Sequence, residues 1–428
     1  MKPLTRSTRI LCLFDYKATT GFATVSTNIV KELRRRFGRY LELHIVPINY
    51  FGTEVSLIDE NDKDTTLYPM TAAAREKDEI GRFSFLQRLD LQRPDFVPYD
   101  GYFIIHDPGI GVSMVPVLEE IMERYRGKGY KKPRGLFYFP ADSVPLDTFF
   151  PANGKGLGFF DELVTYTEYG KVEILKKAPT LRSKLSVIPH GSNRQDFFAL
   201  PEKDKKTFRA AYFGSNSEKL VIINVNRNQF RKDIPMTMLG VHYFVEDNPE
   251  LKGKVFLYLH MHPKDEMGWD LRLIGQQLGW TEGVDYGFPP EGEQHHGASV
   301  ETLRGIYNAA DLYLTTTSGE GWGLSITEAM MCECPVMAPV HTSLQEIGGL
   351  NRSRIWPLEV DAPYCATSDS VLRWQCSPWE ISERITECLQ KTTERALKIV
   401  NAKDYVLGLS WPRVCDEWED IFRRLFFY

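Results

Sequence analysis

The chain has 428 residues, of which 43% are hydrophobic and 25% charged, and its formal net charge at pH 7 is −5. These values are ordinary for a globular protein of two or three domains, and they give no support to a nucleic-acid-binding or membrane-embedded protein. No apolar run approaches the length of a spanning helix, and the apolar stretch near the N-terminus is too short for a signal peptide.

In the N-terminal half, short apolar runs alternate with segments of helical periodicity. We expect a helix over residues 21–37, opening just after Gly21, and further helical segments within 114–125 and 170–178. The expected strands cover residues 9–16, 41–50, 101–109, 135–142 and 162–170. Strands that alternate with helices favour a parallel sheet with right-handed crossovers, as in a doubly wound α/β domain.

This alternation breaks near residue 200 and then resumes. Residues 199–217 are polar and charged, which predicts a linker or an exposed helix. The strands expected beyond them cover residues 220–227, 254–261, 310–317 and 334–340. The sequence therefore predicts one Rossmann-like domain at residues 1–198 and a second at 218–410.

Glycines mark the loop that follows the strand expected at residues 310–317. Ligands of doubly wound sheets bind beyond the carboxyl ends of the strands, where loops of this kind gather. Gly321 and Gly323 allow the backbone to take positive φ and to approach a ligand closely. The helix that starts near Leu324 and Ser325 would offer unpaired N–H groups and a positive dipole end to an anion.

Two glutamates accompany this loop, Glu320 before the turn and Glu328 about one turn into the helix. Carboxylates on either side of a phosphate suit a ligand with hydroxyls on both sides of it, such as a sugar nucleotide. The alternative interpretation is a Gly-rich turn in which the helix dipole favours one glutamate and the second acid is there by chance.

Two cations follow the first strand of the C-terminal half. Arg227 and Lys232 lie five positions apart and are well placed to clamp a diphosphate, the arginine as a fork and the lysine as a point charge. When such a pair is considered alone, a solvated basic loop is the better explanation.

Taken together, these features resemble the donor site of glycosyltransferase family 4, a retaining family with the GT-B fold. The similarity includes residues 187–198, 303–338 and 409–422. The sequence departs from the family pattern at Asn193, where an Asp is usual, and at Glu333, where a Gly is usual. The resemblance implies two Rossmann-like domains facing a cleft, with residues 411–428 as a helix that crosses back to the N-terminal domain.

The resemblance also implies roles for the site residues. Glu320 would hold hydroxyls of the donor sugar, and Glu328 the ribose hydroxyls of the nucleotide. Arg227 and Lys232 would neutralise the diphosphate, helped by backbone amides near Gly323, Leu324 and Ser325.

The activity implied is transfer of a sugar, with retention, from a nucleoside-diphosphate sugar of UDP or GDP type to an acceptor hydroxyl, with no cofactor. A sugar-nucleotide epimerase, a phosphorylase-like enzyme on the same fold and a non-catalytic nucleotide-sugar-binding module are the alternatives.

The N-terminal domain should supply the acceptor side. Gly21 follows the first strand, where GT-B enzymes bring a loop close to the donor phosphates. The family often has a histidine on the strand that matches residues 136–143, and this chain lacks it there. His106 and Asp142 are equal candidates to replace it, with Asp107 next, although a lone Asp is more often a helix cap or turn former.

No metal is expected, because Cys332 and Cys334 have no second pair or nearby histidine to complete a zinc site. The odd number of cysteines, seven, favours reduced thiols in a cytoplasmic protein.

Basic stretches at residues 31–37 and 124–135 are explained by solvated helix faces. They also leave open a lipid-linked or polyanionic acceptor and a peripheral contact with an anionic membrane surface. The acceptor, whether a glycan, a lipid-linked saccharide or another hydroxyl-bearing molecule, is not identified by the sequence.

Overall fold

The computed structural model describes residues 6–50, 57–59, 62–71, 75–92, 96–143, 156–365 and 371–428. By their contacts the residues form two compact units. Unit 1 comprises Met1–Ala141, Leu146–Gly191 and Trp411–Tyr428, and unit 2 comprises Asp142–Pro145 and Ser192–Ser410. Within the predicted linker, the segment Glu202–Phe213, which is rich in charged residues, forms helix α6 of unit 2.

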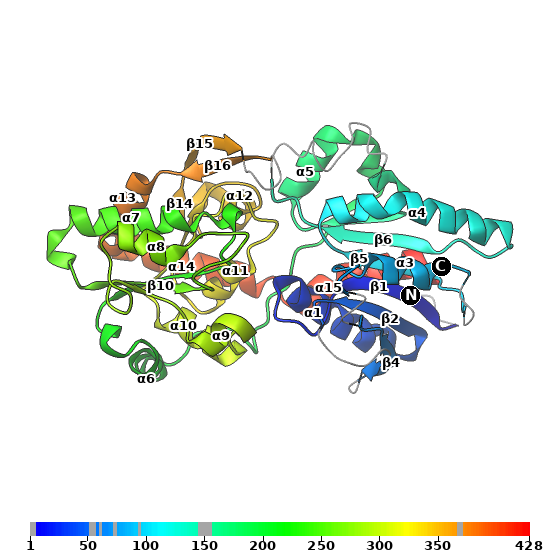
Figure 1. The fold of residues 1–428 in the computed structure, drawn as a ribbon, viewed down its shortest axis with the longest axis horizontal. Helices are drawn as coiled ribbons and strands as arrows, with labels where there is room; N and C mark the ends of the chain where they lie inside the picture. Colours follow the sequence, from blue (N-terminus) through cyan, green and yellow to red (C-terminus); the bar gives the residue numbers. More distant parts are fainter. Residues whose placement is uncertain are drawn as a thin grey trace. The chain divides into compact units, whose positions relative to one another are not determined.

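Unit 1 is built on an eight-stranded sheet in the order β3-β4-β2-β1-β5-β6-β7-β8 (Figure 1). The β3–β4 pair is antiparallel and the other pairs are parallel. The strands are β1 (Thr8–Asp15), β2 (Leu41–Ile48), β3 (Leu57–Asp59), β4 (Asp62–Leu67), β5 (Gly101–Ile105), β6 (Arg134–Phe139), β7 (Glu162–Thr165) and β8 (Leu185–Val187). The α-helices are α1 (Gly21–Phe37), α3 (Arg82–Leu89), α4 (Pro108–Gly127), α5 (Glu168–Lys177) and α15 (Trp411–Phe422).

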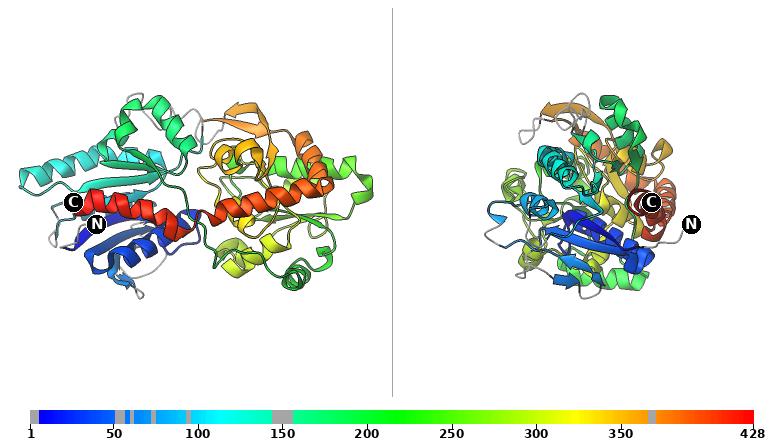
Figure 2. Two further views of the ribbon diagram at one scale, coloured as in Figure 1. Left: turned by 180° about the vertical axis from the view of Figure 1, so that it is seen from behind. Right: turned by 90° about the vertical axis from the view of Figure 1, so that its right-hand side faces the viewer.

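The sheet of unit 1 is buried on both faces, which explains its continuous apolar strands. In β5, Tyr102 and Ile104 join a buried cluster that includes Met114 of α4. The intervening Phe103 points the other way and packs on Trp418 of α15, with ring centroids 5.4 Å apart. Figure 2 shows α15 (red) lying along this second face.

Unit 2 is built on a six-stranded parallel sheet in the order β11-β10-β9-β12-β13-β14. The strands are β9 (Leu220–Val225), β10 (Val255–His260), β11 (Tyr286–Gly287), β12 (Leu312–Leu314), β13 (Val336–Pro339) and β14 (Trp356–Leu358). A separate antiparallel hairpin is formed by β15 (Val360–Cys365) and β16 (Leu372–Cys376). With α6, the helices are α7 (Ile234–Asp247), α8 (Leu271–Gln277), α9 (Glu291–His296), α10 (Val300–Ala309), α11 (Leu324–Met331), α12 (Leu344–Ile347), α13 (Pro378–Gln390) and α14 (Thr392–Leu407).

One face of the unit 2 sheet packs against α7 and α13. Leu257 and Leu312 from the sheet share a buried cluster with Met238 of α7 and Ile381 of α13. The two helices pack closely at Gly240, where an added Cβ would lie 2.4 Å from Ile381. Both units therefore have a mainly parallel sheet covered by helices, and the predicted α/β class with two Rossmann-like halves is confirmed.

The strand order places the functional loops. In unit 2 the chain moves outward from β9 through β10 on one side and through β12 on the other, so the order reverses between β9 and β12. The loops that follow two such strands separate and leave room for a ligand beyond their carboxyl ends. In unit 1 the same reversal falls between β1 and β5.

Candidate functional site

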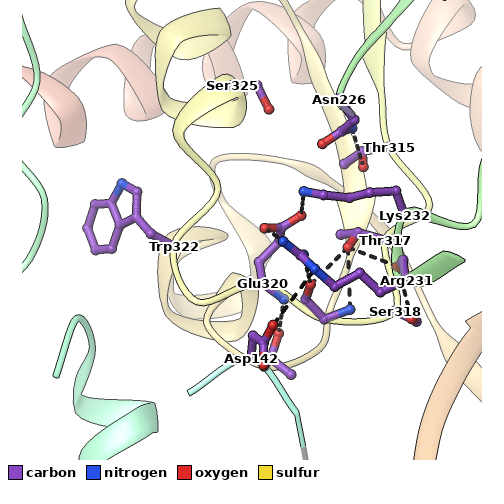
Figure 3. Close-up of polar contacts among 12 residues, drawn as sticks. Asp142, Asn226, Arg231, Lys232, Thr315, Thr317, Ser318, Glu320, Trp322 and Ser325 are labelled. Carbon is purple, nitrogen blue, oxygen red and sulfur yellow. Dashed lines mark hydrogen bonds and ion pairs between the residues drawn. The ribbon is translucent and has the colours of Figure 1, made fainter. Parts of the chain in front are cut away.

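In unit 2, the loop after β9 and the loop after β12 are hydrogen-bonded to each other at this switch point (Figure 3). The backbone N–H of Ser318 donates to the carbonyl of Arg231 at 2.7 Å. The hydroxyl of Thr316 donates to the carbonyl of Asp233 at 2.8 Å. These bonds hold the two loops side by side.

Lys232 and Glu320 form a buried ion pair at the centre of the two loops, with the lysine ammonium donating to the glutamate Oε1 (Figure 3). The residues are only 8% and 6% exposed. Burial would raise the pKa of Glu320, but the positive charges of Lys232 and Arg231 outweigh it and lower that pKa. Burial lowers the pKa of Lys232 to about 8, although Glu320 opposes the change. Near neutral pH the pair therefore consists of a carboxylate and an ammonium.

Arg231 is a third charged member of this cluster, and the sequence analysis did not single it out. Its guanidinium Nη1 donates to the carbonyl of Gly319 at 2.8 Å and lies 3.4 Å from Glu320 Oε2. Its Nε lies 3.8 Å from the carboxylate of Asp142. The sequence signal that could have pointed to Arg231 is its position directly before Lys232. In the structure, a 3-10 turn at Phe230–Lys232 carries both cations.

Arg227 occupies a different environment from Lys232. Its side chain is 65% exposed, and its Nε lies 3.1 Å from the carboxylate of Asp265. The structure thus joins Lys232 to Glu320 and Arg227 to Asp265, although both cations belong to the loop after β9.

Helix α11 begins at Leu324, directly after Gly323, whose φ is 96°. Gly321 was also expected to allow positive φ, but it is not one of the glycines that adopt it. The hydroxyl of Ser325, on the first turn, forms a 2.8 Å hydrogen bond with that of Tyr313. This bond ties the start of α11 to strand β12.

Glu328 lies on the second turn of α11 and accepts a hydrogen bond of 2.8 Å from the hydroxyl of Tyr307. Burial raises the pKa of Glu328 to about 7, and the bond from Tyr307 acts in the opposite direction. Glu320 and Glu328 thus differ in charge state, since the first is held as a carboxylate and the second titrates near neutral pH.

Four candidate residues were predicted in the N-terminal domain; three of them lie in unit 1, and Asp142 lies in unit 2. Gly21 begins α1, and His106 follows β5, so both lie at the switch point of that sheet. The ring of His106 stacks on Phe22 with centroids 6.0 Å apart. Burial lowers the pKa of His106 to about 4, with Asp15 opposing this, so the imidazole is neutral at pH 7. Asp107 precedes α4 with its side chain 56% exposed, and its N–H donates to His106 Nδ1 at 2.7 Å.

The described residues lack both a metal-ligand cluster and a membrane-spanning helix. In that part of the chain, no group of three or more His, Cys, Asp or Glu side chains is arranged to hold a metal ion. None of the helices seen there is both long enough and apolar enough to cross a membrane.

Part of the chain is similar in sequence to known glycosyltransferases. Residues 236–354 match the family model described as Glycosyl transferases group 1. The chain is 23% identical over 181 residues to alpha-galactosylglucosyldiacylglycerol synthase of Streptococcus pneumoniae, covering 39% of this chain and 40% of that protein. It is 25% identical over 175 residues to a probable sucrose-phosphate synthase of Thermosipho melanesiensis, covering 40% and 36% respectively. The aligned part is thus less than half the length of each relative.

Solved structures match over nearly the whole chain. Sucrose-phosphate synthase from Thermosynechococcus elongatus superposes with a TM-score of 0.65 at 13% identity, covering 98% of this chain and 99% of that one. HepE of Anabaena in complex with UDP-glucose gives a TM-score of 0.66 at 12% identity, with 97% and 100% covered. The trehalose-6-phosphate synthase OtsA gives 0.67 at 13% identity, with 97% and 98% covered.

These matches show that the fold is GT-B, as the sequence resemblance predicted. Together with the group 1 match they support a GT-B glycosyltransferase. Membership of family 4, the retaining outcome and independence from metal stay predictions.

Proposed function

We propose that this protein is a glycosyltransferase of family 4 that moves a hexosyl group from a nucleoside-diphosphate sugar to an acceptor hydroxyl, with retention and without a metal. The observation that carries the proposal is the buried Lys232–Glu320 ion pair at the switch point of unit 2. Helix α11 begins four residues after Glu320 and bears Glu328. A UDP-type donor is supported by the structural similarity to HepE, which was solved with UDP-glucose.

The charges explain how such a site would work. Breaking the bond between the anomeric carbon and the phosphate oxygen leaves extra negative charge on the diphosphate. Lys232 and the N–H groups at the start of α11 stabilise that charge, and Arg227 supplies a second cation from the exposed part of the same loop. Because these groups are in place before the reaction, little reorganisation is needed as the charge develops.

Glu320 and Glu328 would hold opposite ends of the donor. The ionised Glu320 accepts hydrogen bonds from hydroxyls of the transferred sugar, and Glu328 accepts them from the ribose. Attack by the acceptor on the face that the diphosphate leaves retains the anomeric configuration. The acceptor oxygen then bonds to the anomeric carbon, and its proton passes to the departing phosphate. On the acceptor side, the neutral imidazole of His106 is available to orient the acceptor hydroxyl.

The proposal is tested by incubating the purified protein with a panel of UDP- and GDP-hexoses and measuring release of nucleoside diphosphate. We expect slow release from one donor in the wild type and release at least about tenfold slower in Glu320→Gln. Isomerised donor would identify an epimerase instead, and tight binding of the donor without turnover would identify a binding module.

The metal-independent part of the proposal has its own test. Release measured in EDTA should equal release measured in Mg²⁺ or Mn²⁺. Complete loss on chelation, restored by either metal, would contradict it.

A further inference from the structure

The β15–β16 hairpin stands outside the six-stranded sheet of unit 2, yet it contacts both loops of the site. The hydroxyl of Tyr364 on β15 donates to the hydroxyl oxygen of Ser318 at 2.9 Å. The side-chain amide of Gln375 on β16 donates to the carboxylate of Asp233 at 2.9 Å. One bond therefore reaches the loop after β12, and the other reaches the loop after β9.

Both bonds end beside the buried ion pair. Ser318 is two residues before Glu320, and Asp233 directly follows Lys232. The hairpin thus holds the two chain segments that carry the pair, although these segments leave different strands of the sheet.

The contacts come from one face of the hairpin. Tyr364 lies opposite Arg373 across the two strands, and Gln375 is two residues farther along β16. Because side chains alternate between the faces of a strand, these three residues share one face. Arg373 is 5% exposed, and its guanidinium Nη1 would lie 3.2 Å from a Cβ added to Gly319. This face of the hairpin is therefore packed on the turn Ser318–Glu320.

Ser318 connects the hairpin to the other anchors of the turn. Its hydroxyl accepts from Tyr364 and donates to the carbonyl of Arg231 at 2.9 Å, which uses its one O–H and a lone pair. On the far side of the turn, the Glu320 N–H donates to the hydroxyl of Thr342 at 3.0 Å, and the Ser343 hydroxyl donates to the Glu320 carbonyl at 2.7 Å. The turn Ser318–Glu320 is thus held at Ser318 by the hairpin and Arg231, and at the Glu320 backbone by Thr342 and Ser343.

We propose that Tyr364, Arg373 and Gln375 are positioning residues, and that this face of the hairpin holds the Lys232–Glu320 pair in the geometry that the donor requires. The proposal rests on the function proposed above and adds a named element to it. A group that must be placed to a fraction of an ångström loses effectiveness when its support is removed, even though the support never touches the substrate.

The test is a double-mutant cycle between Tyr364→Phe and Ser318→Ala, with Leu372→Ala as the control. Leu372 belongs to the same hairpin and is 36% exposed. We expect Tyr364→Phe to lower kcat about threefold to tenfold, as losing one hydrogen bond allows, and to leave the affinity for nucleoside diphosphate unchanged. The double variant should be no slower than the slower single variant, because both changes break the same connection.

A second readout does not depend on activity. Hydrogen exchange of the segment 315–323, followed by mass spectrometry, should accelerate in Tyr364→Phe and in Gln375→Met but not in Leu372→Ala. Unchanged exchange in both hairpin variants, or effects on kcat that simply multiply in the double variant, would overturn the positioning role. If the wild type transfers no sugar, the proposed function fails, and the exchange measurement still decides whether the hairpin holds the turn.

Discussion

At the scale of single residues, burial decides what each charged group of this site can do. Lys232 and Glu320 are removed from water, which costs several kcal/mol per ion unless each finds a close partner. Removing one partner leaves the other as an uncompensated buried charge, and such changes typically cost about 3–5 kcal/mol of stability. Glu328 has a hydroxyl partner in place of a cation, and its pKa is raised to about 7 as a result of burial.

This difference leads to a kinetic prediction for the two glutamates. In the proposed function Glu320 holds the sugar whose bonding changes, so Glu320→Gln should lower kcat at least about tenfold, the scale of a lost charge-assisted hydrogen bond. In the same proposal Glu328 holds the ribose, whose binding is similar in the ground and transition states, so Glu328→Gln should mainly raise the donor KM. Steady-state kinetics of both variants and calorimetry with nucleoside diphosphate separate the two effects. Equal weakening of nucleoside diphosphate binding by both variants would show that the sugar and ribose sides are assigned wrongly.

The raised pKa of Glu328 also predicts how stability depends on pH. The folded chain keeps this proton up to about pH 7, whereas the ordinary value is 4.5, so between these values the folded state binds more protons than the unfolded state. The contribution of Glu328 to the free energy of unfolding therefore falls as pH rises through that window. Glu328→Gln removes the dependence and should be more stable than wild type by about 1–3 kcal/mol at pH 8, but not near pH 4.

Urea unfolding at the two pH values measures this difference. Tyr307→Phe provides the matched comparison, because it removes the donor that favours the charged form of Glu328. Its cost in stability should be larger at pH 8 than at pH 4. A difference between Glu328→Gln and wild type that is the same at both pH values would be evidence against a raised pKa.

The role of Arg231 is a feature of the site that the sequence did not predict. The spacing of Arg227 and Lys232 singled out the loop after β9, but it did not reveal that Arg231 turns toward Glu320. That orientation depends on the 3-10 turn at Phe230–Lys232, which directs Arg231 toward the carbonyl of Gly319. Local turn geometry of this kind is set by the partner loop, which lies far away in the sequence.

At the scale of elements, the long periodic segments were predictable and several of the shortest strands were not. The helix expected at residues 21–37 has those bounds, because its apolar spacing and the cap at Thr20 are local signals. Strands such as β11, with two residues, and β14, with three, are too short to show a period. The β15–β16 hairpin was missed as well, since its role depends on contacts with Ser318 and Asp233 and not on its own pattern.

The turn after β12 supports a prediction at this scale. A Cβ added to Gly319 would lie 1.9 Å from the carbonyl oxygen of Asp142, so Gly319→Ala must displace the turn. We expect a loss of activity on the order of 100-fold, which a shift of about 1 Å near reacting groups can cause. Gly292→Ala is the control, since nothing lies within 4 Å of a Cβ at that position of α9. Turnover and thermal unfolding of both variants check this, and normal turnover in Gly319→Ala would show that the turn tolerates displacement.

At the scale of the whole molecule, the chain leaves unit 1 at Gly191 and returns to it at Trp411. The returning segment completes the core of unit 1. Trp418 is fully buried against Phe103 and Tyr138, at centroid distances of 5.4 and 4.9 Å. Arg36 of α1 adds ion pairs of 2.8 and 2.7 Å to Asp416 and Glu419 of α15. Unit 1 therefore depends on residues more than two hundred positions away in the sequence.

This dependence predicts that damage to α15 destabilises unit 1 selectively. Trp418→Ala removes a fully buried aromatic side chain and should cost about 3–5 kcal/mol. Trp379→Ala in unit 2 is the matched control, because Trp379 is 58% exposed and should cost less than about 1.5 kcal/mol despite stacking on Tyr243. Hydrogen exchange should then accelerate in β1 and β5 of the Trp418 variant and stay unchanged in β9 and β10. Equal acceleration in the strands of both units would mean that they unfold as one cooperative body, and the C-terminal helix would then stabilise the whole chain and not unit 1 alone.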